Sequence, residues 1–203
     1  MLPQERLAQQ IEFLLVCDQL KSVQRTTLLH DGTRAENSAE HSWHLALMAL
    51  TLGEYAPAGT DLNKVLRLLL VHDLIEIEAG DLHFDATAAA LAQKAADEEA
   101  AAHTLFGRLP QAQGEYFYAL WQEFEAQATL EARFAKAIDA LQPMLLTWGE
   151  GGLGCTDRFP ELTLERVLRL KEPRLNEFPA LWAVAQATLN RACAAGILNK
   201  QPT

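Results

Sequence analysis

The stretch DLNKVLRLLLVHDLIEIEAG, residues 61–80, combines an apolar helical face with acids that interrupt it. Its apolar side chains recur at helical spacing and define one buried face: Leu62, Val65, Leu66, Leu69 and Leu70. At about 100° per residue, Asp73 falls inside that face and Glu76 follows on the same side. Burying such acids is costly unless they are protonated or neutralised by cations. The sequence therefore predicts a helical core that contains carboxylates.

Two further segments place polar side chains on apolar helical faces. His41 shares its face with Leu45 and Met48, and Asp139 lies on a side of its helix that is otherwise apolar. Together with His72 and Asp73, they could supply four nitrogen and oxygen ligands to one divalent metal ion.

Each of these residues, taken alone, could have a purely structural role and bind no metal. An inward histidine such as His41 is ordinarily a hydrogen-bonded core residue. Asp139 could pair with Lys136 or with Arg133, although both bases lie partly round the helix from it. The combination of all four ligand-type residues on inward faces favours the metal site.

The remaining periodicity predicts an all-α protein with no strand ladder. We expect a single domain over residues 1–203, with a core over about 5–170 and a C-terminal helical hairpin over about 155–198 packed on it. Residues 21–38 form a long polar loop in this prediction, and residues 149–154 a glycine-rich break. Ser38, Asp61 and Pro110 lie near the starts of three predicted helices, Gly80 lies at the end of one, and Pro143 should kink another. The predicted helices cover residues 4–20, 38–55, 61–79, 87–106, a segment from 110, 129–148, 163–171 and 179–197.

Composition excludes several classes of protein. The chain has 203 residues with 17 Lys and Arg against 27 Asp and Glu, a net charge of −10 that disfavours binding to a nucleic acid polymer. The apolar stretches are too short to span a membrane, and the N-terminus lacks the pattern of a signal peptide. Three cysteines without a CxxC pair indicate neither a disulfide framework nor a thiolate zinc site. We therefore expect a cytoplasmic protein with reduced thiols.

Four ordered motifs carry a resemblance to a known family. They are LKSVQRT (residues 20–26), AENSAEHSWH (35–44), VHDLIEIEAGD (71–81) and KAIDALQPML (136–145). They resemble the 5′-deoxynucleotidase branch of the HD-domain metal-dependent phosphohydrolases. The resemblance implies an HD-type helical bundle in which one divalent ion, Mn, Co, Fe, Zn, Ni or Mg, is held by His41, His72, Asp73 and Asp139.

The same resemblance implies roles for three further residues. Glu76 and Asp81 match acids that act in proton transfer, and Arg25 matches the arginine that holds the substrate phosphate. The implied reaction is hydrolysis of the phosphomonoester of a nucleoside or deoxynucleoside 5′-monophosphate, or of a similar small phosphate ester, by a homodimer. One departure concerns the sugar: Thr26 and Thr27 stand where the family has an aromatic residue soon after the arginine.

Two alternatives stay open on the sequence. The chain could be a non-catalytic nucleotide-binding or regulatory HD protein, although proton-transfer acids beside the metal argue against that hypothesis. It could also be a dinuclear HD phosphodiesterase or oxygenase, with His83 and His103 as additional ligands. His83 closely follows a loop acid and His103 lies in a segment of mixed polarity, so one metal ion is favoured.

Overall fold

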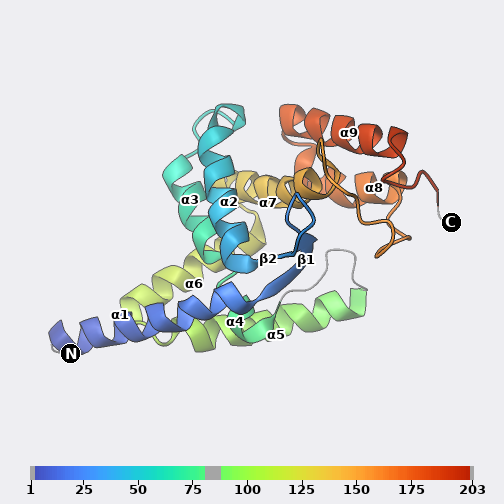
Figure 1. Cartoon of the computed structure of the whole chain (residues 1–203). Coiled ribbons are helices and arrows are strands. Elements are labelled where there is room, and N and C mark those ends of the chain that lie inside the picture. Colours follow the sequence, from blue (N-terminus) through green and yellow to red (C-terminus); the bar gives the residue numbers. More distant parts are fainter. Residues whose placement is uncertain (1–2, 81–87, 202–203) are drawn as a thin grey trace.

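The computed structural model describes residues 3–80 and 88–201, and most of them are α-helical (Figure 1). The all-α prediction is thereby confirmed. None of the described helices is both long enough and apolar enough to cross a membrane. The helices are α1 (Pro3–Cys17), α2 (Ser38–Thr51), α3 (Leu62–Val71), α4 (Glu76–Ala79), α5 (Ala88–Phe106), α6 (Gln111–Ala126), α7 (Leu130–Trp148), α8 (Leu164–Leu175) and α9 (Pro179–Ala194). Two short 3₁₀ turns, η1 (Asp18–Ser22) and η2 (Gly53–Tyr55), follow α1 and α2.

Helix α7 is the centre of the bundle. It packs against α2, α3, α6, α8 and α9, and it crosses the middle of the molecule (Figure 1). Most of its side chains are buried, including Phe134, Ile138, Leu141 and Met144. Because so many elements contact α7, a polar residue on it can meet side chains from several distant segments.

The prediction of a long polar loop over residues 21–38, and of no strand ladder, is wrong. Strands β1 (Gln24–Leu28) and β2 (Ala35–Asn37) pair antiparallel, with Gly32 at a φ of 71° in the connecting turn. Neither strand alternates apolar and polar residues, which is the pattern that identifies a strand in a sequence. The hairpin packs against α7, so a tertiary contact that a local pattern does not record helps to hold it.

The continuous helix predicted over residues 61–79 is also wrong, since α3 ends at Val71 and α4 begins at Glu76. The Nδ1 atom of His72 lies 2.8 Å from the carbonyl oxygen of Leu69. In an unbroken α-helix that oxygen would accept from the backbone N–H of Asp73. The histidine ring thus competes with the helical hydrogen bond at the point where the helix stops.

Three helix starts differ in their agreement with the sequence. Asp61 caps α3 as predicted, because its side chain accepts hydrogen bonds from the next turn of backbone. At α2, however, the cap is Asn37 rather than Ser38, and Asn37 forms a reciprocal capping box with Glu40. Pro110 is the residue before α6 and not its first residue. The shift at α2 leaves the Ser38 hydroxyl available for a contact elsewhere.

Candidate metal centre

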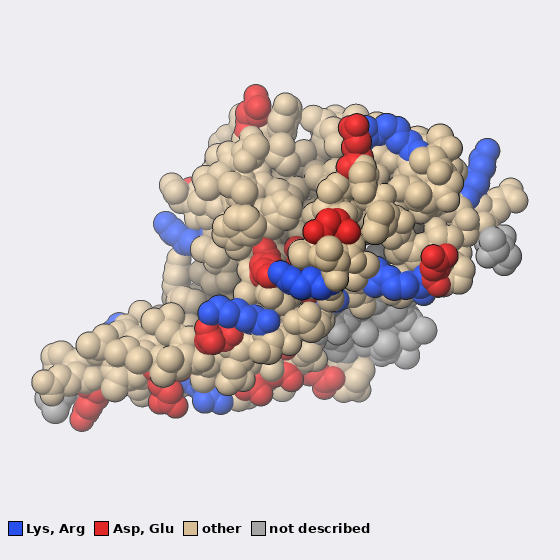
Figure 2. All heavy atoms as spheres, viewed as in Figure 1, with Lys and Arg blue, Asp and Glu red and all other residues tan. Residues whose placement is uncertain are grey.

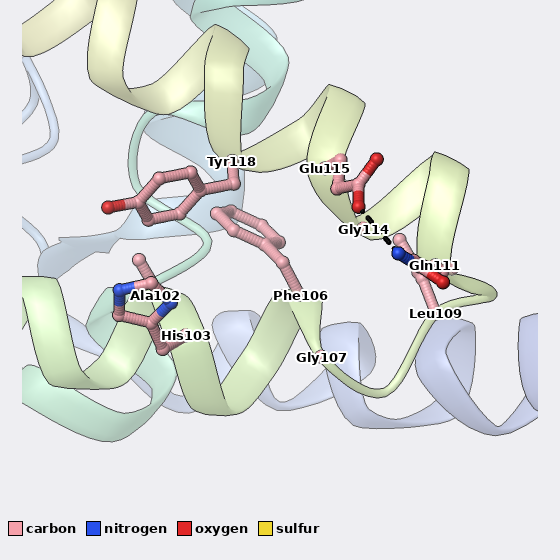
Figure 3. A pocket seen from close by; sticks show the side chains of 9 residues that line it. All are labelled: Ala102, His103, Phe106, Gly107, Leu109, Gln111, Gly114, Glu115 and Tyr118. Carbon is pink, nitrogen blue, oxygen red and sulfur yellow. Dashed lines mark hydrogen bonds between the residues drawn. The ribbon is translucent and has the colours of Figure 1, made fainter.

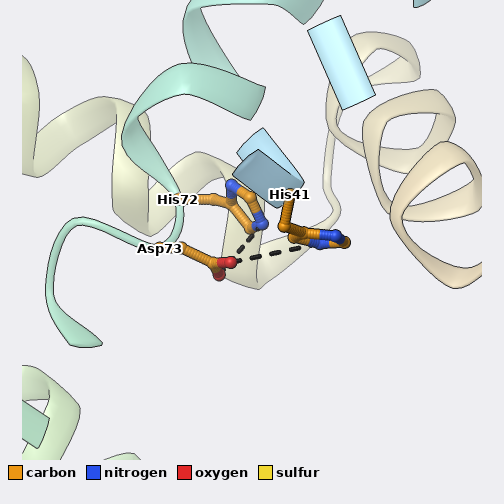
Figure 4. Close-up of side chains that lie close together, drawn as sticks. All are labelled: His41, His72 and Asp73. Carbon is orange, nitrogen blue, oxygen red and sulfur yellow. Dashed lines mark ion pairs between the residues drawn. The ribbon is translucent and has the colours of Figure 1, made fainter. Parts of the chain in front are cut away.

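The four predicted metal ligands come together at the junction of α2, α3 and α7. His41 lies in the first turn of α2, His72 follows the end of α3, Asp73 lies in the next turn and Asp139 lies on α7. The Nε2 atom of His41 is 3.1 Å from Oδ1 of Asp139 and 4.0 Å from Oδ2 of Asp73. Nε2 of His72 is 2.9 Å from Oδ1 of Asp73. Figure 4 shows the Asp73 carboxylate directed at both imidazole rings.

Both imidazole rings present Nε2 to the carboxylates. The Nδ1 atom of His72 faces the Leu69 carbonyl, which can only accept, so Nδ1 carries a proton. Among the described residues, the buried Nε2 atom of His72 has no hydrogen bond of suitable geometry, despite the nearby Asp73 oxygen. A nitrogen lone pair beside carboxylate oxygens is the donor set that divalent transition metals bind. Ligand atoms from His41, His72 and Asp73 all lie within 4.8 Å of one another.

A second group of polar side chains supports His41 from behind. Its Nδ1 atom lies 3.1 Å from Oε1 of Gln142 and 3.3 Å from Oε2 of Glu36. Gln142 in turn donates through Nε2 to Oε1 of Glu36 at 2.6 Å and lies 3.2 Å from Nδ1 of His44. These contacts orient the His41 ring so that Nε2 points at Asp139.

The sequence analysis did not identify Glu36 or Gln142 as functional residues. Both lie within the quoted motifs, yet Glu36 belongs to a strand that has no recognisable period, and glutamine carries no metal-site signature. The signal that could have identified them is their place in the motifs: Glu36 lies in the motif that contains His41, and Gln142 lies in the motif that contains Asp139.

Opposite charges offset the burial of the cluster. Burial and the Arg25 charge both act to lower the pKa of His41, but hydrogen bonds to Asp139 and Glu36 outweigh them and raise it to about 9. Burial would raise the pKa of Asp73, yet the neighbouring His72 and Arg25 hold it below its ordinary value. Burial would likewise raise the pKa of Asp139, but stabilising partners, chiefly the hydrogen bond with His41, lower it. Each of these aspartates is therefore held as a carboxylate.

The alternative pairing of Asp139 with bases on its own helix is not what the structure contains. Lys136 reaches Oε1 of Glu125 at 3.0 Å and lies over the Phe124 ring. Arg133 binds Glu177 at 2.8 Å. Asp139 instead has its hydrogen bond with His41, so its carboxylate belongs to the cluster.

Two of the three other predicted site residues lie at the cluster. Arg25, on β1, donates from Nη1 to Oδ2 of Asp73 at 3.0 Å, and its side chain is only 13% exposed. Glu76 is buried at the start of α4, where the Ser38 hydroxyl donates to its Oε2 atom at 2.7 Å. Asp81 lies outside the described residues.

The histidines invoked for a second metal ion are not part of this geometry. His83 lies outside the described residues. His103 is exposed on α5, where it lies 3.3 Å from Glu99 and stacks on Tyr118. There it lines a cavity of about 380 Å³ between α5 and α6 that includes none of the four predicted ligands (Figure 3).

The cysteines offer no competing chemistry. All three, Cys17, Cys155 and Cys193, are free thiols. Burial raises the pKa of Cys17 and of Cys155 to about 11, so both are protonated near neutral pH and poor nucleophiles.

Acidic side chains of low exposure gather at the cluster. They are Glu36, Asp73, Glu76 and Asp139, and the basic side chains of low exposure near them are Arg25, Lys136 and Lys171. Uncompensated buried charge is expensive, so a cation at the cluster would stabilise the fold as well as supply chemistry.

Comparison with known proteins agrees with the family that the sequence motifs resemble. A family model described as the HD domain matches residues 17–182. A crystal structure of a predicted metal-dependent phosphohydrolase from Magnetospirillum magnetotacticum MS-1 is 41% identical, covers 98% of both chains and has a TM-score of 0.88. An HD-domain phosphohydrolase from Listeria innocua, 17% identical, covers 92% of this chain and 88% of its own with a TM-score of 0.62, a likeness of fold alone.

Curated relatives are similar over a shorter region. The 5′-deoxynucleotidase HDDC2 of Homo sapiens is 33% identical over 136 residues, which make up 66% of this chain and 65% of the relative. Its counterpart in Xenopus laevis is 34% identical over 66% of each chain. The match thus spans about two thirds of the length of these relatives.

The support behind His41 leads to a first prediction. Glu36→Ala should weaken divalent metal binding about 10- to 100-fold, because the ring loses one of the groups that orient Nε2. Titration with Mn²⁺ or Co²⁺ against a competing chelator measures the change. Glu54→Ala, which removes an exposed glutamate, is the matched control. Equal affinities for the Glu36 and control variants would contradict this role.

Proposed function

Because the chain belongs to the HD domain family, we propose that it is a metal-dependent phosphohydrolase acting on nucleoside or deoxynucleoside 5′-monophosphates or a similar small phosphate ester. The observation that carries the proposal is the clustering of His41, His72 and Asp73, whose ligand atoms lie within 4.8 Å of one another, with Asp139 at 3.1 Å from the Nε2 atom of His41. The similarity to proteins described as a metal-dependent phosphohydrolase and as 5′-deoxynucleotidases supports the substrate class.

In this proposal His41, His72, Asp73 and Asp139 hold one divalent ion. Such an ion lowers the pKa of a bound water and polarises a phosphoryl oxygen. Histidine and carboxylate ligands suit Mn, Co, Fe, Zn or Ni, and Mg is compatible with the carboxylates.

Glu76 is proposed as the group that moves the proton. The Ser38 hydroxyl fixes one of its oxygens, which orients the carboxylate within the buried site. A carboxylate so placed can take a proton from the attacking water or deliver one to the leaving sugar oxygen. Asp81 is proposed as a second acid of the same pocket, on the resemblance of its motif.

Arg25 is proposed to hold the substrate phosphate. Its guanidinium contacts Asp73, so it lies at the edge of the metal cluster, where the phosphate of a metal-bound ester would sit. A planar, permanently charged donor suits a phosphate because it can make two parallel hydrogen bonds.

A homodimer in the cytoplasm completes the proposal. Helix α1 exposes an apolar stripe of Leu7, Ile11, Leu14 and Leu15, and the surface of its protruding half carries few charges in the view of Figure 2. An exposed apolar stripe of this kind is typical of an interface. The free cysteines are consistent with a reducing compartment.

The proposed activity predicts a division of labour between Asp73 and Glu76. With added Mn²⁺ or Co²⁺, the wild-type protein should release phosphate from members of a panel of nucleoside monophosphates. Asp73→Ala should lose both metal and turnover, whereas Glu76→Ala should keep the metal and lose most of the rate.

Metal analysis and phosphate release, measured on the same samples, decide between the outcomes. A metal-loaded wild-type protein that binds nucleotides and hydrolyses none would identify a regulatory binding protein instead. An empty site in Glu76→Ala would make Glu76 a ligand rather than a proton-transfer group.

Arg25→Ala should raise KM for a monophosphate by about one to three orders of magnitude, as expected for a charge-assisted contact in a partly buried site. Metal content should stay unchanged, since Arg25 is not a ligand in this proposal. An unchanged KM would contradict phosphate binding by Arg25.

The same assays test the sugar preference. Thr26 and Thr27 place no aromatic wall beside the arginine, so we expect ribose and deoxyribose forms of one base to differ by less than about 100-fold in kcat/KM. A thousandfold preference for the deoxy form would mean that another residue forms the wall.

The dimer predicts a mass of about twice 22.5 kDa by light scattering. Joint replacement of Leu14 and Leu15, 64% and 69% exposed, by glutamate should give monomers, since two charges would enter the apolar contact. Leu153→Glu is the matched control, because Leu153 is equally exposed, at 66%, but lies in the loop after α7. A monomeric wild-type protein would refute the dimer.

A further inference from the structure

A buried lysine from the C-terminal part of the chain lies next to the candidate metal centre. Lys171, on α8, is only 7% exposed, which is rare for lysine because removing an ammonium group from water is costly. Helix α8 packs on α7, the helix that carries Asp139. The sequence analysis gave Lys171 no role.

The electrostatic surroundings of Lys171 connect it to both parts of the proposed site. The negative charge of Asp139 stabilises the ammonium group, whereas Arg25 and Arg174 repel it. Burial, the largest influence, lowers the pKa of Lys171 to about 8, which leaves the group mainly protonated near neutral pH. Two cations, Lys171 and Arg25, are thus close enough to repel each other beside the cluster, and an anion bound between them would relieve that repulsion.

Lys171 also lines a small cavity together with Thr26 and Thr27, the residues that follow Arg25 on β1. The volume of this cavity, about 30 Å³, suits one water-sized group and excludes a nucleoside. On its rim, Arg158 is held by a hydrogen bond from Nη1 to the carbonyl oxygen of Thr26. The cavity is otherwise lined mainly by apolar side chains and includes Pro143, one turn beyond Asp139 on α7, so Lys171 lies between β1 and that turn. An ammonium group in this position can donate to a phosphate oxygen.

We propose that Lys171 is a second phosphate-binding residue, which holds the substrate phosphate from the side opposite the metal ion while Arg25 holds it from β1. This inference rests on the proposed function, because it takes the phosphate of a small ester as the ligand. It assigns the C-terminal hairpin of α8 and α9 a part in binding the substrate in addition to covering α7.

The competing explanation is that Lys171 only orients Asp139. The two roles differ in what they affect: a partner of Asp139 acts on metal binding, whereas a phosphate-binding residue acts on anion affinity at unchanged metal content. Lys136 offers a matched comparison, because it is buried to the same degree and its charge also acts on Asp139, but it pairs with Glu125 and does not line the cavity.

The experiment compares Lys171→Met, Lys171→Arg and Lys136→Met with the wild-type protein, each loaded with the same divalent metal. Calorimetry with inorganic phosphate measures anion binding without any need for turnover, and steady-state kinetics on a nucleoside monophosphate give KM and kcat separately. Lys171→Met should weaken phosphate binding and raise KM by about 10- to 100-fold, the effect of losing one charge-assisted contact. Lys171→Arg should retain most of the affinity, and Lys136→Met should bind phosphate like the wild-type protein.

Three results would overturn the inference: unchanged phosphate affinity in Lys171→Met, a loss of metal in that variant with normal phosphate affinity per loaded site, or an equal loss in Lys136→Met. If Lys171→Met does not fold, Lys171→Gln provides the same comparison. A wild-type protein that hydrolyses no ester would refute the proposed function alone, since the phosphate-binding comparison would still test Lys171.

Discussion

Carboxylates directed into the interior, where α2, α3, α7 and the hairpin meet, impose the constraint on which the rest of the structure depends. Glu36, Asp73 and Glu76 are buried, and Asp139 is mostly so. If one of these carboxylates were buried in an apolar core without a partner, the free-energy cost of removing its charge from water would exceed the stabilisation from the packing around it. The histidines and the charges of Arg25, Lys136 and Lys171 reduce that cost. The elements around the cluster are arranged so that these charges reach one another.

Two departures from regular helix make this arrangement possible. The break after Val71 lets His72 face the Leu69 carbonyl while Asp73 and Glu76 both point inward. The hairpin of β1 and β2 brings Arg25 against Asp73 and Glu36 against His41. Irregular backbone is thus concentrated where the chemistry is, and the regular helices behind it, α7 above all, provide the rigid support that a precise site needs.

The buried side chains that contact the proposed ligands from behind determine how those ligands are oriented. Glu36 lies beside His41 and is 3.7 Å from the Nε atom of Arg25, so one buried carboxylate is shared by a proposed ligand and a proposed phosphate-binding residue. Through Gln142 the same carboxylate is tied to α7. The orientation of the imidazole and the position of the guanidinium therefore depend on one another. By contrast, the roomier cavity beside His103 has no such network of buried charges among its lining residues.

The sequence by itself determined the helical class, several helix starts and the polar residues that lie on apolar helical faces. Asp61 caps the helix that follows it, as its position predicts, because capping involves backbone only three residues away. Helical periodicity likewise identified His41 and Asp139 as inward residues, since the angle between neighbours on a helix is fixed. The tertiary structure alone decided the strand pairing, the break at His72 and the contacts of Glu36, Gln142 and Lys171. Gln142 and Glu36 are 106 residues apart, and no local pattern encodes which distant side chain will satisfy a buried polar group. Only the packing of several elements around α7 brings such partners within hydrogen-bond distance.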